Sequence, residues 1–223
     1  MWIKICANTN LADAQLAVEA GADAVGFVFA QSPRRVSAAQ VSQITPQLSD
    51  AVEKYGVFVD ADFDEIVSTV TEAGLTGVQL HVNHDPLLPS KLRERFGSML
   101  RILQVVHYAQ DFETQLGALR QDDAIDGVLV DSRTATAVGG TGVSFDWHAA
   151  SSRFQTSASR LRLIAAGGLN PANVSAAIRT LRPWGVDVVT GVESAPGRKD
   201  PARVKAFIDA AKTAAVEMAA ASR

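Results

Sequence analysis

The segment WIKICANTNLADAQLAVEAGADAVGFVF, residues 2–29, contains a complete strand–helix–strand unit. Apolar and β-branched runs at Trp2–Cys6 and Ala24–Phe29 predict two strands, and Leu11–Ala20 between them has a helical pattern. Gly21 follows that helix, at the position where a left-handed C-cap residue is expected. Because the helix returns the chain to the end at which the first strand began, the two strands are predicted to be parallel.

The same alternation continues along the rest of the chain. Helical patterns at residues 62–73, 86–96 and 171–181 separate further short apolar runs, and the Ala-rich segment 204–221 suits an amphipathic helix. Eight βα units close naturally into a barrel, and 223 residues are enough for that fold. We therefore predict an α/β protein with a single (β/α)8 TIM-barrel domain over residues 1–223. The eight predicted strands are Trp2–Cys6, Ala24–Phe29, Tyr55–Val59, Gly77–Leu80, Leu100–Val106, Gly127–Val130, Leu161–Ala165 and Val186–Val189.

Residues with special backbone preferences mark the predicted helix ends. Gly74 and Gly185 follow helical runs, as Gly21 does, and are expected to be C-cap residues. Asn170 before Pro171 has the order expected of an N-cap and a first helical residue. The alternative architecture, an open doubly wound sheet, favours a glycine-rich phosphate loop after the first strand. The segment after the first predicted strand contains no such loop.

The composition is typical of a soluble globular protein. Hydrophobic residues make up 47% of the chain and charged residues 20%, which provides an ample core. A net charge of -3 leaves no basic excess for a phosphate backbone, so we expect no nucleic-acid partner. There is no leader and no apolar run of about eighteen residues, so we expect a cytoplasmic protein without a membrane segment. A single cysteine excludes an internal disulfide, and either a monomer or a homodimer is expected.

Polar residues follow most of the predicted strands. The active site of such a barrel forms at the C-terminal ends of its strands, so these residues are candidates for the site. We expect His81 to line the pocket, and the planar guanidinium of Arg34 suits bidentate binding of a carboxylate. The histidines lack the spacing of zinc sites, so no metal is expected, and His84, His107 and His148 are expected in loops or at the surface. The candidates are Cys6, Asn8, Arg34, Asp60, His81, His107 and Asp131.

Alternation along the first strand directs Lys4 and Cys6 into the barrel. An inward lysine is rarely unpaired, so a carboxylate such as Asp187 or Asp131 is expected beside it. A cation near Cys6 favours thiolate over thiol and makes the cysteine a usable base. A lone cysteine is also often a small buried hydrophobe, and an aspartate after a strand often caps a loop. Their position at strand ends favours the catalytic interpretation of Cys6 and Asp131.

Three glycine-containing segments follow the last three predicted strands. Gly139 and Gly140 begin the first segment, Gly167 and Gly168 lie in the second, and Thr190–Gly191 begins the third. Glycines let backbone amides approach an anion closely, and the loops after strands 7 and 8 of such barrels often hold a phosphate. We therefore predict a small phosphorylated substrate, bound in part by these segments.

Short motifs in both halves of the chain, in order from residue 2 to about residue 210, resemble phosphoribosylanthranilate isomerase. Each fragment alone is modest, but their common order makes the resemblance specific. The motifs are Lys4-Ile5-Cys6, residues 21–29, Ser32-Pro33-Arg34, Gly56-Val57-Phe58-Val59, Gln79-Leu80-His81, Val130-Asp131-Ser132, residues 139–147, Gly167-Gly168-Leu169-Asn170-Pro171, Gly191-Val192-Glu193 and Gly197-Arg198-Lys199-Asp200.

The resemblance implies an Amadori rearrangement of N-(5'-phosphoribosyl)anthranilate to 1-(2-carboxyphenylamino)-1-deoxyribulose 5-phosphate, without a cofactor. It also implies that Asp131 is the general acid that protonates the ring oxygen and that Cys6 is the general base that removes the sugar C2 proton. Arg34 matches the arginine that holds the anthranilate carboxylate in the family. The glycine segments match its phosphate-binding loops.

Two positions depart from the family's pattern, which usually has glycine after the cysteine and after Gln-Leu-His. This chain has Ala7 and Val82 there, and their side chains restrict the loop backbones near the pocket. Two alternatives stay open. One is a related phosphosugar barrel, such as an epimerase or an indole-glycerol-phosphate lyase, and the other is a degenerate barrel that binds a phosphorylated ligand without turnover. Retention of Cys6, Arg34 and Asp131 counts against the second.

Overall fold

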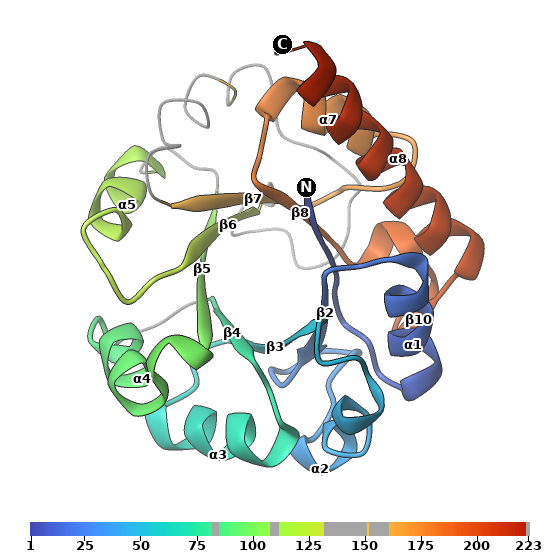
Figure 1. The fold of residues 1–223 in the computed structure, drawn as a ribbon. Coiled ribbons are helices and arrows are strands. Elements are labelled where there is room, and N and C mark those ends of the chain that lie inside the picture. Colours follow the sequence, from blue (N-terminus) through green and yellow to red (C-terminus); the bar gives the residue numbers. More distant parts are fainter. Residues whose placement is uncertain (82–84, 108–111, 132–150, 152–160, 222–223) are drawn as a thin grey trace.

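Eight parallel strands close into a barrel in the order in which they occur along the chain (Figure 1). The computed structural model describes residues 1–81, 85–107, 112–131, 151 and 161–221. The predicted (β/α)8 architecture is confirmed, because each strand pairs with its sequence neighbours and the first pairs with the last. The strands are β1 (Trp2–Ile5), β2 (Ala24–Val28), β3 (Glu53–Phe58), β4 (Gly77–Leu80), β5 (Arg101–His107), β6 (Gly127–Asp131), β7 (Arg162–Ala166) and β8 (Gly185–Val188).

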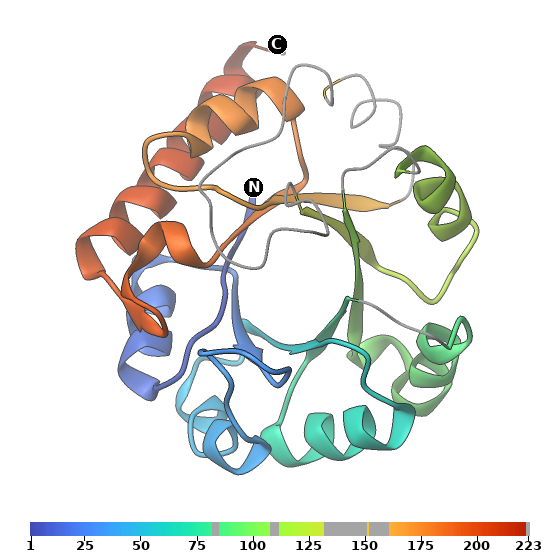
Figure 2. The same cartoon turned by 180° about the vertical axis from the view of Figure 1, so that it is seen from behind.

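Helices form an outer ring around the strands, as both views along the barrel show (Figures 1 and 2). Among the described residues, no helix combines the length and the apolar character needed to cross a bilayer. A short hairpin of β9 (Glu193–Ala195) and β10 (Arg198–Lys199) lies between the barrel and the last helix in the sequence. The helices are α1 (Leu11–Ala20), α2 (Ala38–Val41), α3 (Phe63–Ala73), α4 (Leu88–Phe96), α5 (Phe112–Leu119), α7 (Val174–Leu181) and α8 (Pro201–Ala221), with 3-10 turns η1 (Thr45–Gln47), η2 (Gly97–Met99) and η3 (Thr190–Val192).

Side chains of β1 alternate between two apolar cores, as its sequence predicts. Ile3 and Ile5 belong to the large core between the strands and the helices. Trp2 belongs to a smaller core inside the barrel, where its ring meets Tyr55 edge-on at 5.8 Å and stacks on Trp184 at 5.3 Å. This inner core therefore fills one part of the barrel interior, and the buried polar side chains of the barrel lie toward its other end.

Capping residues explain where several helices begin and end. Gly21 and Gly74 end α1 and α3 with φ values of 96° and 61°, which confirms them as left-handed C-caps. The prediction for Gly185 is wrong, because it begins β8, and the left-handed residue after α7 is Arg182. The predicted start of α7 is also wrong. The side chain of Asn170 accepts hydrogen bonds from the amides of Ala172 and Asn173, so a turn precedes the helix.

We predict that substitution by alanine has opposite effects on stability at two glycines of the helical layer. Gly74→Ala should lower the free energy of unfolding by about 1 kcal/mol, because its φ is 61° and a Cβ would lie 3.3 Å from Thr45 Oγ1. Gly117→Ala should raise it by roughly 0.5–1 kcal/mol, because Gly117 lies within α5 and a Cβ there meets no atom within 4 Å. Denaturant unfolding of both variants measures the difference. Equal shifts in the same direction would contradict the assignment of the Gly74 backbone.

Candidate active site

A pocket of about 540 Å³ lies at the C-terminal ends of the barrel strands. This volume is within the range of small-molecule sites. Gly191 is not among the described residues that line the pocket, and Gly139 and Gly140, which were also predicted to bind substrate, lie outside the described residues. The predicted site residues that line the pocket are Cys6, Arg34, His81, Asp131, Gly167, Gly168 and Thr190.

Cys6 lies directly after β1, and only 2% of its surface is exposed. Its backbone amide donates to the carbonyl of Val188 at 2.9 Å, which fixes the end of β1 against β8. Gly26 of β2 is a site residue that sequence reasoning missed. A Cβ on Gly26 would lie 2.5 Å from Cys6 Sγ and 3.1 Å from Lys4 Nζ, so only glycine leaves room for both groups. A glycine inside a strand was the available signal.

Lys4 is fully buried and lies close to Cys6 at the base of the pocket. Its ammonium donates to Asp187 Oδ1 at 2.8 Å and to Gln79 Oε1 at 2.9 Å, which confirms the predicted pairing with Asp187. Burial opposes the charge, but the neighbouring Asp187 carboxylate and Cys6 outweigh it and raise the pKa of Lys4. The ammonium is therefore held in its charged form beside the thiol.

The net effect on Cys6 differs from the prediction. Burial raises the pKa of the Cys6 thiol, the ammonium of Lys4 lowers it, and the negative charge of Asp187 raises it again. The sum is a raised pKa, so the expectation that the nearby cation brings it below the ordinary value is wrong. The sequence reveals the cation, but desolvation depends on the packing of the folded chain.

Asp131 ends β6, with 3% of its surface exposed. In the sheet it pairs in register with His107 of β5 and with Ala166 of β7, the residue before Gly167. Between β6 and β1 in the closed barrel lie β7 and β8, so Asp131 and Cys6 reach the same pocket from separate strands. The prediction that His107 is a loop or surface residue is wrong, because it is the last residue of β5 and is half-buried.

His81 follows β4, and its backbone amide donates to the carbonyl of Phe58 at 3.0 Å. Its Nε2 lies 3.1 Å from Nε2 of Gln79. Because the oxygen of Gln79 accepts from Lys4, its amide nitrogen is the donor toward His81. A polar chain thus runs from His81 through Gln79 and Lys4 to Asp187, and all of these residues except Lys4 line the pocket.

Backbone strain lies next to Cys6. Ala7 has a φ of 62°, in the left-handed region that favours glycine. The following residue, Asn8, stabilises this turn. Its backbone N–H and its side-chain Nδ2 both donate to the carbonyl of Gly26, at 2.9 and 3.2 Å. Asn8, a predicted candidate, therefore shapes the loop. Asp60, another candidate, is an exposed residue with a φ of 54°.

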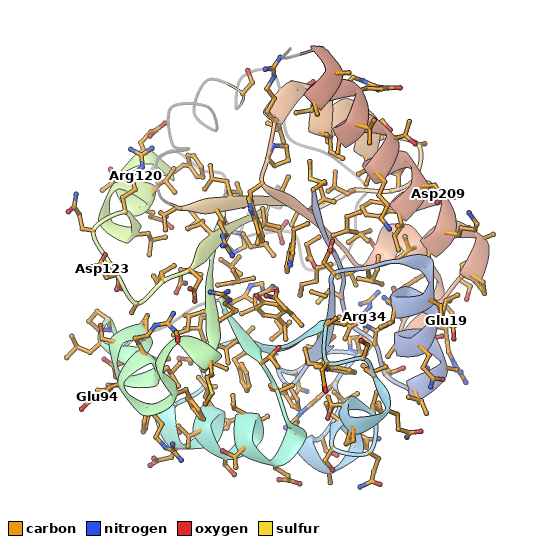
Figure 3. All side chains as sticks on the ribbon, in the orientation of Figure 1. Glu19, Arg34, Glu94, Arg120, Asp123 and Asp209 are labelled. Carbon is orange, nitrogen blue, oxygen red and sulfur yellow. The ribbon has the colours of Figure 1, made fainter. Side chains whose placement is uncertain are left out.

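Arg34 lies in a short loop after β2 that is closed by hydrogen bonding of Val36 N to the Val28 carbonyl at 2.9 Å. Figure 3 places Arg34 within the outline of the molecule, whereas the labelled Glu19, Glu94 and Asp209 lie on its rim. The guanidinium holds a carboxylate of the chain itself: Nε and Nη2 donate to Glu193 at 2.9 and 2.6 Å.

Glu193 is a second site residue that sequence reasoning missed. Burial opposes its ionisation, but hydrogen bonding by Arg34 and the charge of Lys199 outweigh burial and lower the pKa of Glu193. Burial lowers the pKa of Lys199, and the Glu193 carboxylate opposes that change. The only signal in the sequence was the position of both residues in family motifs.

The loops after β7 and β8 pack directly on each other. Gly167 and Gly168 have φ values of 81° and 64°, and among the described residues no backbone carbonyl bonds to their amides. A Cβ on Gly191 would lie 2.0 Å from the carbonyl oxygen of Leu169, so glycine is required for this contact. Within the described part of the chain, no three His, Cys, Asp or Glu side chains are grouped as a metal ion requires.

Comparisons with known proteins agree on one family. The family model described as N-(5'-phosphoribosyl)anthranilate (PRA) isomerase matches residues 3–210. The N-(5'-phosphoribosyl)anthranilate isomerase of Pelobacter propionicus is 39% identical over 211 residues, covering 94% of this chain and 95% of the relative. That of Geobacter sulfurreducens is 40% identical over 213 residues, covering 94% and 98%.

Solved structures lead to the same family. Phosphoribosyl anthranilate isomerase from Thermotoga maritima superposes with a TM-score of 0.84 at 37% identity, covering 96% of this chain and 99% of that chain. Another structure of such an isomerase, in complex with reduced 1-(o-carboxyphenylamino)-1-deoxyribulose 5-phosphate, has a TM-score of 0.80 at 36% identity, with the same coverage. This chain therefore belongs to the N-(5'-phosphoribosyl)anthranilate isomerase family of tryptophan biosynthesis.

Proposed function

We propose that the chain performs the isomerisation of its family with Asp131 as general acid and Cys6 as general base. The observation that carries this assignment is that the two side chains come from separate strands and line one pocket. An acid and a base in such an arrangement can act on two positions of one small substrate. The reaction converts N-(5'-phosphoribosyl)anthranilate into 1-(2-carboxyphenylamino)-1-deoxyribulose 5-phosphate.

The proposed reaction needs one proton donated and one removed. Protonation of the ring oxygen by Asp131 opens the furanose to a Schiff base. The Cys6 thiolate then takes the proton from sugar C2, and the resulting enolamine becomes the aminoketose. The ammonium of Lys4 supports the anionic form of the thiol, because it lies beside Cys6 and its pairing with Asp187 holds it in place. All of these steps use side chains of the chain itself.

The two ends of the substrate carry negative charge, and the pocket offers a different partner for each. We assign the phosphate to the loops after β7 and β8, where Gly167, Gly168 and Thr190 line the pocket and Gly191 packs against the carbonyl of Leu169. We assign the anthranilate carboxylate to Arg34, in the loop after β2 on another part of the wall. His81 lines the pocket as a further substrate contact.

We propose a single-domain enzyme of the cytoplasm, active as a monomer or a homodimer. Support for one domain comes from the coverage of relatives, since 94% of this chain spans 95% of the Pelobacter propionicus isomerase. One related solved structure is described as generated monomers of the dimeric phosphoribosylanthranilate isomerase of Thermotoga maritima. Sedimentation of the purified chain distinguishes the two states here.

The acid and base assignments predict that both side chains are indispensable to turnover. Cys6→Ser should lower kcat by about 10²–10⁴, because a serine hydroxyl hardly ionises near neutral pH, and Asp131→Asn should do likewise because an amide cannot donate the proton. Steady-state kinetics measures both. Binding of reduced 1-(2-carboxyphenylamino)-1-deoxyribulose 5-phosphate serves as control and should survive each change. A Cys6→Ser enzyme with near-parental turnover would refute the assignment of the base and point to His81.

The burial of Cys6 predicts that its thiolate forms at high pH. Because burial raises the thiol pKa, the fraction of thiolate should still be rising above about pH 8.5, the ordinary midpoint of a cysteine. Lys4→Met removes the cation that lowers the pKa, so the midpoint should move further upward. The pH dependence of alkylation by iodoacetamide measures this directly, since Cys6 is the only cysteine.

Lys54→Met is the matched control for Lys4→Met. Lys54 is also a buried lysine of the barrel, but its ammonium donates to the carbonyl of Ser49. Lys54 is not one of the described residues that line the pocket. The Cys6 midpoint should be unchanged in this variant. A downward shift in Lys4→Met, or equal shifts in both variants, would show that the ammonium of Lys4 does not stabilise the thiolate.

The assignment of Arg34 predicts a loss that depends on the substrate's carboxylate. Arg34→Lys should weaken binding of the anthranilate-bearing product analogue by roughly 1–3 kcal/mol, because lysine cannot reproduce the planar bidentate fork. Ribulose 5-phosphate has no carboxylate, so its binding should change much less. Titration calorimetry with the two ligands makes the comparison. Equal losses would mean that Arg34 has a structural role only.

A further inference from the structure

Glu193 begins β9 and is one of the few carboxylates buried near the pocket, with 6% of its surface exposed. One oxygen accepts from Arg34 Nε at 2.9 Å, from the Gly197 amide at 3.2 Å and from Lys199 Nζ at 3.4 Å. The other accepts from Arg34 Nη2 at 2.6 Å. Both oxygens are thus used, and both bind the same guanidinium.

The direction of these bonds fixes the orientation of Arg34. A guanidinium is planar and carries five N–H donors in a rigid fork. Glu193 takes the side that runs along Nε and Nη2, so the edge between Nη1 and Nη2 is set at a fixed angle to it. Arg34 lines the pocket, whereas Glu193 is not among the described residues of its wall. The carboxylate therefore holds the guanidinium from behind.

We propose that Glu193 is a positioning residue, which holds Arg34 so that the outer edge of its guanidinium receives the substrate's carboxylate. This inference rests on the proposed role of Arg34. Holding the fork in advance reduces the side-chain entropy that binding would otherwise cost. Because Nε and Nη2 are already engaged by Glu193, the planar arginine can contact a second carboxylate only along its other edge.

Lys199 keeps this cluster attractive to an anion. Glu193 alone would neutralise Arg34, but the buried ammonium of Lys199 also pairs with Glu193, so the three charged side chains together carry one net positive charge. Lys199 Nζ in addition donates to the backbone carbonyl of Cys6 at 2.6 Å. The hairpin that carries Glu193 and Lys199 thus contacts both the arginine and the backbone of the proposed base.

The opposite interpretation is that Glu193 competes with the substrate for Arg34. In that case its removal would strengthen substrate binding. The two interpretations predict changes of opposite sign in KM, so one substitution separates them. Glu193→Gln keeps the size of the side chain and removes its charge, and its amide nitrogen would face the N–H groups of Arg34.

The experiment is a double-mutant cycle of Glu193→Gln and Arg34→Met with the full-length enzyme. In the parental background Glu193→Gln should raise KM for phosphoribosylanthranilate about tenfold, with kcat and inhibition by ribulose 5-phosphate changed by less than about threefold. In the Arg34→Met background the same substitution should change KM by less than about twofold, because Glu193 acts through Arg34. Glu217→Gln, which alters an exposed glutamate paired with Arg179 at 2.9 Å, is the matched control and should change nothing.

Each other outcome has a definite meaning. A fall in KM, or no change, in the parental background overturns the proposal, and so does an equal rise in both backgrounds, which a merely structural role would give. If Arg34→Met alone leaves KM unchanged, the proposed function of Arg34 fails first. Thermal unfolding checks that the variants fold. Glu193→Asp, which keeps the charge on a shorter side chain, replaces Glu193→Gln in the same cycle if the latter does not fold.

Discussion

The ion pair between Lys4 and Asp187 joins the first strand of the barrel to the last, directly below Cys6. Two buried charges cost several kcal/mol in lost hydration, and they are tolerated because Gln79 and the geometry of the pair satisfy them. Well-packed apolar side chains of similar volume could close a barrel equally well. The charges therefore have their main consequence at the pocket, where the ammonium of Lys4 lies close to the thiol of Cys6.

Because the Lys4–Asp187 ion pair is buried in it, the inside of the barrel contains both an apolar part and a polar part. Toward one end the side chains of Trp2, Tyr55 and their neighbours form an apolar core. Toward the other, Lys4, Gln79, Asp187 and Asp131 are buried and polar. A buried charge needs a partner, so the choice of residue at each of these polar positions restricts the choice at its neighbours. The absence of a side chain on Gly26 belongs to the same arrangement, since it leaves the space that Lys4 and Cys6 occupy.

The fold could be predicted from the sequence because it depends on local patterns, namely apolar runs, helix lengths and glycine C-caps. The pairing of Lys4 could be predicted as well, since an inward charge needs a partner. The raised pKa of Cys6 could not be predicted. The sequence shows the nearby cation, but the desolvation that outweighs it depends on how the folded chain packs around the thiol. The contact between Arg34 and Glu193 could not be predicted either, because the two residues are 159 positions apart in the sequence. Gly185 misled the prediction because a glycine after a helix can equally begin a strand packed on Trp2.

The hydrogen bond from Lys199 to the Cys6 carbonyl spans 193 positions of the sequence, and β8 pairs with β1 over a similar separation. Contacts of such high sequence separation slow folding, because the loop-closure entropy is lost before they contribute. During synthesis the chain emerges from its N-terminus at roughly 5–20 residues per second. The strand that carries the proposed base is therefore made first, whereas its partner β8 is the last strand of the barrel to be made. A ribosome-bound chain that lacks β8 and the residues after it would hold an unclosed barrel edge, and the contact of the C-terminal hairpin with the backbone of Cys6 would form only after Lys199 has been added.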